Sequence, residues 1–276
     1  MPPGAIRTER RTTPLFGLGL VDAVPDATFV ALARAEAKRN PRIAGRPSVV
    51  TNLVTGAPAV GKFGWKAQVP NLFQFSADAY LNEMGITTPL FPDESCPQGN
   101  CALLACDPVP GVDDDNEDVT AFADFMSFLA PPPRLQLAMA TSRTFDGRSP
   151  TDDVSAGSKL FDSLGCANCH VRSLTSGTSP IAALSRRTFQ PFSDFLLHDM
   201  GSLGDDIAQG AATGREMRTA PLWGLRLLTT FLHDGSASTI EEAILAHDGQ
   251  GRGARSRFAG STSRDRARLV AFLRTL

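Results

Sequence analysis

The chain has 276 residues, of which 42% are hydrophobic, and its formal net charge at pH 7 is −2. This length can bury one sizeable core or two small ones, and 27 Lys plus Arg against 29 Asp plus Glu leave no overall field that would recruit nucleic acid or an anionic membrane. No run of about 18 apolar residues occurs, so the sequence predicts no membrane span.

The first half predicts short segments between glycines and prolines, with two helices among them. One helix is expected from Asp26 to about Arg39. Pro25 suits its first turn, and apolar residues follow at helical spacing with Glu36 on the same face. This stretch therefore predicts an ordinary amphipathic helix.

The acidic run at 113–118, DDDNED, is followed by an apolar stretch that predicts a second helix. Acidic side chains favour the positive end of a helix dipole, and the three prolines at 131–133 should stop the helix. The run could instead bind calcium, but it lacks the glycine of an EF-hand loop. A solvated helix start is the favoured interpretation.

A polar connector reaches about residue 150, and we place a domain boundary in it. The expected units are 1–148, a loop-rich and incomplete first domain, and 149–276, a helical domain with long loops. The fold class that follows is mainly α.

Three helices are expected in the second unit, at 152–165, 236–247 and 263–276. The first delivers the chain into a pair of cysteines. The second begins with a capping box of Ser238 and Glu241 and turns His247 inward.

Cys166, Cys169 and His170 form a C-x-x-C-H motif. This pattern is typical of covalent haem c attachment, in which each cysteine forms a thioether and the histidine binds the iron. A thiol/disulfide enzyme using the same two cysteines would want a βαβ setting, whereas the surroundings are helical. A zinc site would want a second ligand pair at a compatible spacing. The motif therefore favours haem c.

Electron-transfer haems commonly take a second axial ligand from the protein. Helix position favours His247 among five candidates, which are His198, Met200, Met217, His233 and His247. A methionine would raise the reduction potential relative to a second imidazole, and an open position would admit peroxide.

Three further cysteines, Cys96, Cys101 and Cys106, lie close together upstream. They could form one disulfide and leave one thiol, which fits an oxidising compartment. The alternative is three unpaired thiols in a loop. Which two cysteines pair is open.

Several stretches together resemble the di-haem oxidoreductase family of peroxidase or thiol-oxidoreductase type, which is related to bacterial di-haem cytochrome c peroxidases. The resemblance runs from residue 14 to the terminal helix, and the stretches that carry it are PLFGLGLVDAVPD, GKFGWKAQVPNLFQF, LNEMGITTPLFP, AGSKLFDSLGCANCH, PFSDFLLHDMG, GREMRTAPLWGLR and FLHDGSASTIEEAILAH. It implies two c-type cytochrome domains with a haem in each. This chain contains one C-x-x-C-H.

The region that would carry the first haem is expected upstream of Met1, and no signal peptide precedes Pro14. We therefore expect the C-terminal portion of a longer protein that is periplasmic or otherwise exported. A natural single-haem form is the alternative.

The resemblance also implies site residues. The helix after the "HDG" turn carries the second axial ligand, which matches His247, with Met200 as second choice. His198 and His233 are expected to shape the haem pocket through hydrogen bonds. Arg218 and Trp223 are expected to contact propionates or to couple the haem centres.

The function expected is a c-type haem electron-transfer module of a di-haem oxidoreductase of peroxidase type, working with a redox partner protein or a second haem domain. An iron with both axial positions filled should not turn over peroxide, so the chain by itself could be restricted to electron transfer. The alternatives are a haem-free thiol/disulfide oxidoreductase using Cys166 and Cys169, and a pure electron carrier without substrate.

Overall fold

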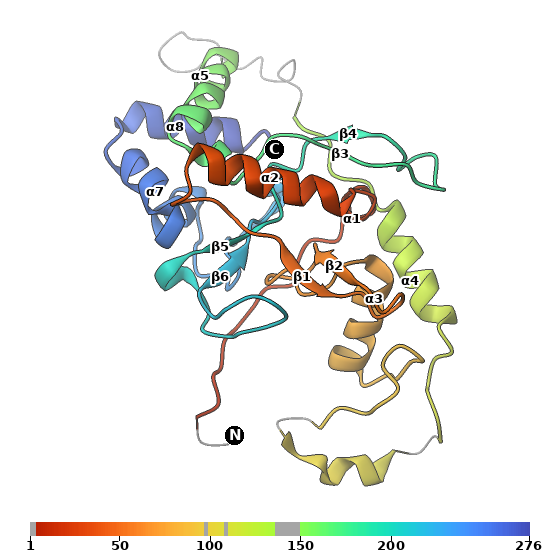
Figure 1. The fold of residues 1–276 in the computed structure, drawn as a ribbon. Helices are drawn as coiled ribbons and strands as arrows, with labels where there is room; N and C mark the ends of the chain where they lie inside the picture. The colour runs from red at the N-terminus through yellow and green to blue at the C-terminus, as the bar shows by residue number, and fades with distance from the viewer. Residues whose placement is uncertain (1–3, 97–98, 108–109, 136–149) are drawn as a thin grey trace.

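The computed structural model describes residues 4–96, 99–107, 110–135 and 150–276. Helices and long irregular connections make up most of this part of the chain, and the strands are short (Figure 1). The α-helices are α1 (Leu18–Asp22), α2 (Asp26–Arg39), α3 (Leu72–Ala79), α4 (Glu117–Phe128), α5 (Pro150–Ser163), α6 (Ile240–Ala246), α7 (Arg252–Ala259) and α8 (Ser263–Leu273). Within the described residues, no helix is long and apolar enough to cross a bilayer.

Helices α2 and α4 lie where the sequence predicts them. Helix α2 follows Pro25, and α4 begins at Glu117, within the acidic run. The carboxylate of Asp114 accepts the backbone N–H groups of Asp118 and Val119, at 3.2 and 3.3 Å. These bonds satisfy N–H groups that a helix start leaves unpaired. The acidic run thus serves the start of α4, as expected.

Helices α5 and α8 pack against each other in the second half. The ring of Phe161 lies edge-on to that of Phe272, with centroids 5.5 Å apart. Gly157 permits this contact, because a Cβ at that position would lie 2.0 Å from the carbonyl oxygen of Arg268. The close approach of the two helices therefore depends on a residue without a side chain.

The predicted capping box of the next helix is shifted by one residue. Thr239 caps α6, and its hydroxyl accepts the N–H of Glu242, whose carboxylate returns to the Thr239 N–H. Ser238, expected to cap, donates its hydroxyl to Glu242 instead, at 2.7 Å. The helix begins one residue later than expected and ends at Ala246, so His247 caps its C-terminus. Helix α7 was not predicted.

Three two-stranded antiparallel sheets were also not predicted. They pair β1 (Ser48–Thr51) with β2 (Pro58–Gly61), β3 (Leu174–Thr175) with β4 (Thr188–Phe189), and β5 (Leu197–Asp199) with β6 (Glu216–Arg218). The third sheet matters for the site, because it sets His198 opposite Met217.

Buried apolar side chains form two main clusters. The first contains Phe29, Leu72 and Met126 together with Trp223, and so draws on both sides of residue 148. The second gathers residues of α5, α7 and α8, including Phe161, Phe258 and Phe272. The proposed boundary falls in 136–149, outside the described residues, and the division into 1–148 and 149–276 stays a prediction.

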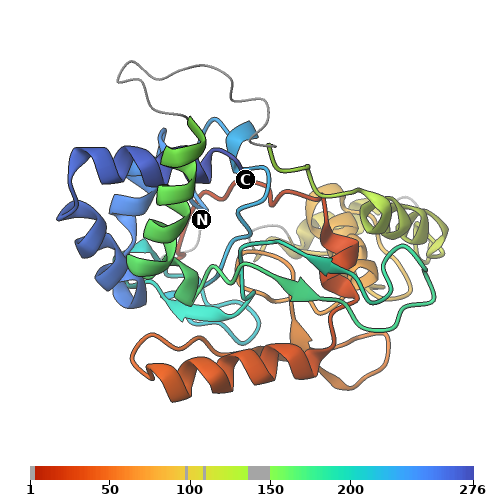
Figure 2. The same cartoon turned by 90° about the horizontal axis from the view of Figure 1, so that it is seen from above.

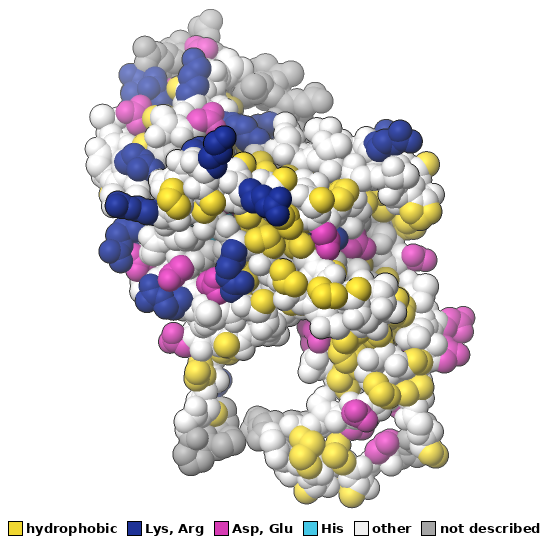
Figure 3. Space-filling view, in the orientation of Figure 1, with side chains coloured by type: hydrophobic (Ala, Val, Ile, Leu, Met, Phe, Trp, Pro, Cys, Tyr) yellow, Lys and Arg dark blue, Asp and Glu magenta, His cyan; other side chains and the backbone are white. Residues whose placement is uncertain are grey.

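Charge is distributed unevenly. Between Lys66 and Arg134 the chain carries 11 Asp plus Glu and no Lys or Arg. This segment includes α3 and α4 and projects from the rest of the chain (Figure 1). On the face drawn in Figure 3, Lys and Arg side chains gather over the opposite part, around α7 and α8.

A cavity of about 510 Å³ lies in the acidic segment. Its lining includes Tyr80, Cys106 and Asp114. The carboxylate of Asp114 already accepts the N–H groups at the start of α4. This cavity is formed by residues 80–118 and does not include the C-x-x-C-H motif.

Candidate functional site

The motif cysteines lie on a tight turn at the end of α5. Gly165 turns the chain with φ 88, in the left-handed region that favours glycine, and a 3₁₀ turn follows over Cys166–Asn168. The N–H of His170 donates to the Cys166 carbonyl at 3.0 Å. The turn thus holds both thiols and the imidazole on one short, hydrogen-bonded loop.

Cys166 and Cys169 are free thiols, not bonded to each other. Burial raises the pKa of Cys166 to about 11 and also raises the pKa of Cys169. The thiolate is the nucleophile in disulfide exchange, and buried thiols of this kind are inert. The arrangement therefore does not favour the thiol/disulfide alternative.

His170 and His247 face each other. Their ring centroids are 6.4 Å apart, and the ring planes are inclined by 60°. A metal between two imidazole nitrogens needs a bond of about 2 Å on each side, and these bonds together with the ring radii roughly account for the observed separation. The two rings come from the motif loop and from the C-terminus of α6, 77 residues apart in sequence.

Both imidazoles are held in the same tautomer. Nδ1 of His170 donates to the carbonyl of Phe192 at 3.0 Å, and Nδ1 of His247 donates to the carbonyl of Ala243 at 2.7 Å. Burial, with the neighbouring His247, lowers the pKa of His170 to about 4, and burial also lowers the pKa of His247. Both rings are therefore neutral at pH 7, with the lone pair on Nε2. This is the usual state of metal-binding histidines.

An unusual backbone positions the carbonyl that orients His170. Phe192 and Phe195 both have left-handed φ angles, 53° and 58°. This conformation is uncommon for bulky residues, and such strain gathers at functional sites. The turn between them directs the Phe192 carbonyl to His170 and places Asp194 behind Cys169, whose carbonyl accepts the Asp194 N–H at 3.0 Å.

The other candidate ligands lie elsewhere or beside this pair. His233 packs edge-on against Trp65, with centroids 6.3 Å apart, and Met217 lies in β6 opposite His198. The terminal methyl of Met200 and the ring of His247 both lie next to Gly251. Of the five candidates, His247 is the one that faces His170.

His198 belongs to a cluster of its own. Its Nδ1 lies 3.6 Å from the sulfur of Cys169, and its Nε2 lies 3.0 Å from the carboxylate of Asp194. The possible ligand atoms of these three residues lie within 4.8 Å of one another, so the cluster could be considered for a metal ion. His198 is ill suited to that role, because Nδ1 also donates to the side-chain oxygen of Gln250 at 3.0 Å.

Asp194 and Gln250, which both contact His198, were not identified from the sequence. Glu36 was placed on a helix face, but its significance was not recognised. Asp194 lies in an irregular segment and Gln250 in a three-residue 3₁₀ helix, and neither segment has a residue spacing that carries a signal. Glu36 did carry one, since the helical pattern places this acid on the apolar face of α2, where it is 4% exposed. A carboxyl group at such a position needs a buried polar partner.

Arg218 and Trp223 are buried donors. The guanidinium of Arg218 lies over the ring of Phe195 and donates to the carbonyls of Gly64 and Thr219, and burial lowers its pKa to about 10. Within the described part of the chain, no carboxylate forms a salt bridge with it. The indole N–H of Trp223 is buried without a hydrogen-bond partner among those residues. Such groups suit an anion, and haem carries two propionates.

A comparison with protein families decides the affiliation. The model described as "Di-haem oxidoreductase, putative peroxidase" matches residues 5–276. The chain belongs to the di-haem oxidoreductase family. Membership makes haem the expected cofactor and oxidoreduction the expected chemistry. No curated protein matches the chain.

Three solved structures illustrate the similarity of the chain to known folds. A MauG-like protein associated with microbial copper homeostasis is 15% identical, with 100% of this chain and 94% of that chain covered and a TM-score of 0.45. The diheme peroxidase BthA from Burkholderia thailandensis is 18% identical over 100% and 93%, with a TM-score of 0.43. Hydrazine synthase of Kuenenia stuttgartiensis is 18% identical over 64% of this chain and 60% of its own, with a TM-score of 0.39.

The residues of the chain fit the cofactor of its family. Two neutral imidazoles face each other with their Nε2 atoms free to bind iron, and two thiols lie on the turn beside them. The Trp223 N–H is an unpaired buried donor. This donor set matches a bis-histidine haem attached through two cysteines.

Proposed function

We propose that the chain is a c-type haem electron-transfer module of a di-haem oxidoreductase. Cys166 and Cys169 would carry the haem through thioethers, and His170 and His247 would be its axial ligands. The observation that carries this proposal is the facing pair of imidazoles, each with Nδ1 bonded to a backbone carbonyl. When bound, haem iron supplies reversible one-electron chemistry.

The side chains around the site have separate tasks. The carbonyls of Phe192 and Ala243 fix the two rings and make each Nε2 a better donor. The turn at 165–170 holds the two sulfurs at the edge of the second apolar cluster, which Cys166 joins. Trp223 and Arg218 would donate hydrogen bonds to the propionates. The apolar residues around the site would keep water away from the iron ligands.

With both His170 and His247 holding the iron, this haem would have no place for peroxide. The part of the reaction that we assign to the chain is therefore to receive an electron from a redox partner protein or a second haem domain and pass it on. A pure electron carrier without substrate is the remaining alternative. Peroxide added to the reduced chain together with its second haem domain separates the two, since only an oxidoreductase of peroxidase type consumes peroxide with electrons from this haem.

The axial ligand is tested by a matched pair of variants. His247→Ala removes one imidazole, so we expect a high-spin ferric spectrum and rapid carbon monoxide binding to the reduced protein. Met200→Leu, whose side chain lies in the same surroundings, should keep the wild-type spectrum. An unaltered spectrum in His247→Ala would remove His247 from the site, and a change in Met200→Leu would replace it with Met200.

We further propose that the protein works in the periplasm or another exported compartment. The disulfide between Cys96 and Cys101 supports this location, because disulfides persist in oxidising surroundings. Fractionation of cells that make the native protein tests it, and recovery in the cytoplasm with both cysteines reduced would contradict it.

A further inference from the structure

A buried acid pair lies behind Cys169. Glu36, from α2, and Asp194 are 4% and 0% exposed. One carboxylate oxygen of Glu36, Oε2, accepts the N–H of Gly45 at 2.9 Å, whereas Oε1 is buried without a donor among the described residues. Asp194 uses both of its oxygens, one for the N–H of Leu196 at 2.8 Å and one for His198 at 3.0 Å.

The hydrogen bonds around His198 fix its charge. The side-chain oxygen of Gln250 accepts the N–H of Asp199 at 3.1 Å, and its amide nitrogen donates to the carbonyl of Ala44 at 3.0 Å. This amide therefore presents an acceptor to Nδ1 of His198, which must donate. Nε2 faces the Asp194 carboxylate. Both ring nitrogens carry protons, so His198 is an imidazolium paired with Asp194.

That pairing leaves Glu36 as the group whose charge can change. Burial opposes a charge on His198, but in the haem-free chain the Cys169 sulfur and Asp194 together raise its pKa well above its ordinary value, and the hydrogen bond to Asp194 is independent of haem attachment. Burial raises the pKa of Glu36 to about 7, and Asp194 adds to the effect. Two carboxyl groups this close cannot both ionise easily, and a proton between them would satisfy the unpaired oxygen of Glu36.

The surroundings of Glu36 contain few other charges. Asp194, just before β5, and His198, within β5, both face the Glu36 carboxyl group. Cys169, on the motif turn, also interacts with this group. Arg218, on β6, interacts with Asp194. The basic side chains of α2 point outward, since Arg34 and Lys38 are exposed. The nearest change of charge available to Glu36 is therefore at the cofactor that Cys169 would carry.

We propose that the Glu36–Asp194 pair is a proton-binding site coupled to the haem, so that the chain takes up one proton with each electron. The inference depends on the proposed attachment of haem at Cys169. The step balances: one electron enters from a one-electron donor, one proton enters from water, and the Glu36 carboxylate becomes a carboxylic acid. Reduction adds a negative charge nearby and favours the protonated carboxyl group.

The experiment is a potentiometric titration of the haem-loaded protein from pH 5.5 to 9. In the wild type, each unit rise in pH near neutral pH should lower the midpoint by up to about 59 mV, the constant for a one-electron couple. Glu36→Gln keeps the size of the side chain and removes the proton site, so its midpoint should be nearly constant there. Glu83→Gln, at an exposed position, is the control and should follow the wild type.

A second measurement, made on the wild type, tests the inference if the Glu36→Gln variant does not incorporate haem. The infrared difference spectrum of the wild type, reduced minus oxidised, should contain a carboxylic acid band that shifts in deuterium oxide. A wild-type midpoint independent of pH, a slope that survives in Glu36→Gln, or the absence of that band overturns the inference while the proposed function stands. A colourless protein defeats the proposed function, and the inference with it.

Discussion

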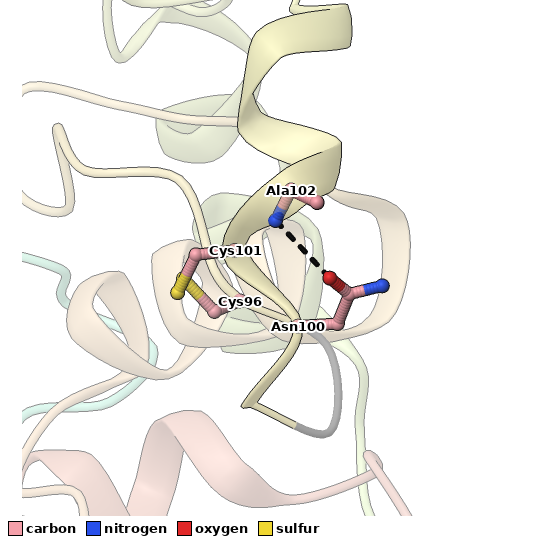
Figure 4. The surroundings of a disulfide bond; sticks show 4 residues. All are labelled: Cys96, Asn100, Cys101 and Ala102. Carbon is pink, nitrogen blue, oxygen red and sulfur yellow. Dashed lines mark hydrogen bonds between the residues drawn. A yellow bond between two sulfur atoms is a disulfide. The ribbon is translucent and has the colours of Figure 1, made fainter.

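Two cysteine-bearing segments of this chain have opposite character. At 96–106 the cysteines lie at the surface, where Cys96 and Cys101 form a disulfide and Cys106 is an exposed thiol. In Figure 4 the disulfide lies beside a 3₁₀ helix that begins with the Asn100 side chain accepting the Ala102 N–H. At 166–169 the two cysteines are half-buried and unlinked.

Both segments contain closely spaced cysteines, so the difference between them lies in the residues that surround the sulfur atoms. The upstream segment has backbone caps and solvent around it, which suits a structural disulfide. The downstream segment has two facing imidazoles, a buried imidazolium and apolar side chains around it. Surroundings of that kind suit a cofactor, so we propose different roles for the two groups of cysteines.

The largest expected effect is on covalent haem attachment, which should depend on one pair of cysteines and not on the other. Cys166→Ala with Cys169→Ala removes both thioether positions, so we expect no covalently attached haem after maturation. Cys96→Ser with Cys101→Ser should retain it in full. Haem staining of denatured protein on a gel measures both variants. Equal staining of the two double variants would contradict the division of roles.

The two segments should also differ in the rate at which their thiols are alkylated. In haem-free protein, Cys106 should react first with iodoacetamide because it is exposed. With a pKa of about 11 for Cys166, only about one thiol in a thousand is ionised at pH 8, so its alkylation should be at least about tenfold slower. Peptide mapping over time gives the order. Faster labelling of Cys166 than of Cys106 would revive the thiol-enzyme alternative.

Removing the surface disulfide should cost stability and leave the site intact. The bond closes a loop with a sequence separation of 5, for which chain entropy predicts about 2 kcal/mol. Urea unfolding of Cys96→Ser with Cys101→Ser should show a loss of up to that size, together with an unchanged haem spectrum. A changed spectrum would mean that the segment supports the site.

The smallest effect concerns the pH dependence of stability. The folded-state pKa of Glu36 is raised to about 7, so between its ordinary value and about 7 the folded chain binds more protons than the unfolded chain. Stability present at acidic pH is therefore lost as pH rises through about 7. Glu36→Gln should lack this loss. Urea midpoints at pH 5 and pH 8 test the difference, and parallel changes in both proteins would contradict it.

The sequence predicts helices well where apolar spacing is regular, as in α2, α4, α5 and α8. It did not reveal α7, because RGARSRFA contains one buried apolar residue, Phe258. Strands of two to four residues leave too little alternation to read. The fold between the long helices therefore had to come from the structure.

The site divides in the same way. Cys166, Cys169 and His170 lie within five residues, so spacing alone predicts their chemistry. Helix position predicted His247, whose ring the structure places opposite that of His170. Gln250 contacts His198 across 52 residues of chain, and no local pattern encodes that contact. Glu36 stood out only as an acid on an apolar face, a signal whose meaning depends on what packs against it.

The most direct test is the mass of the intact protein under denaturing conditions, after production where haem attachment machinery is present. The account predicts one species heavier than the polypeptide by a single haem, and a shift back to the bare polypeptide mass when Cys166 and Cys169 are both replaced. A wild-type chain with the mass of the polypeptide alone would contradict it.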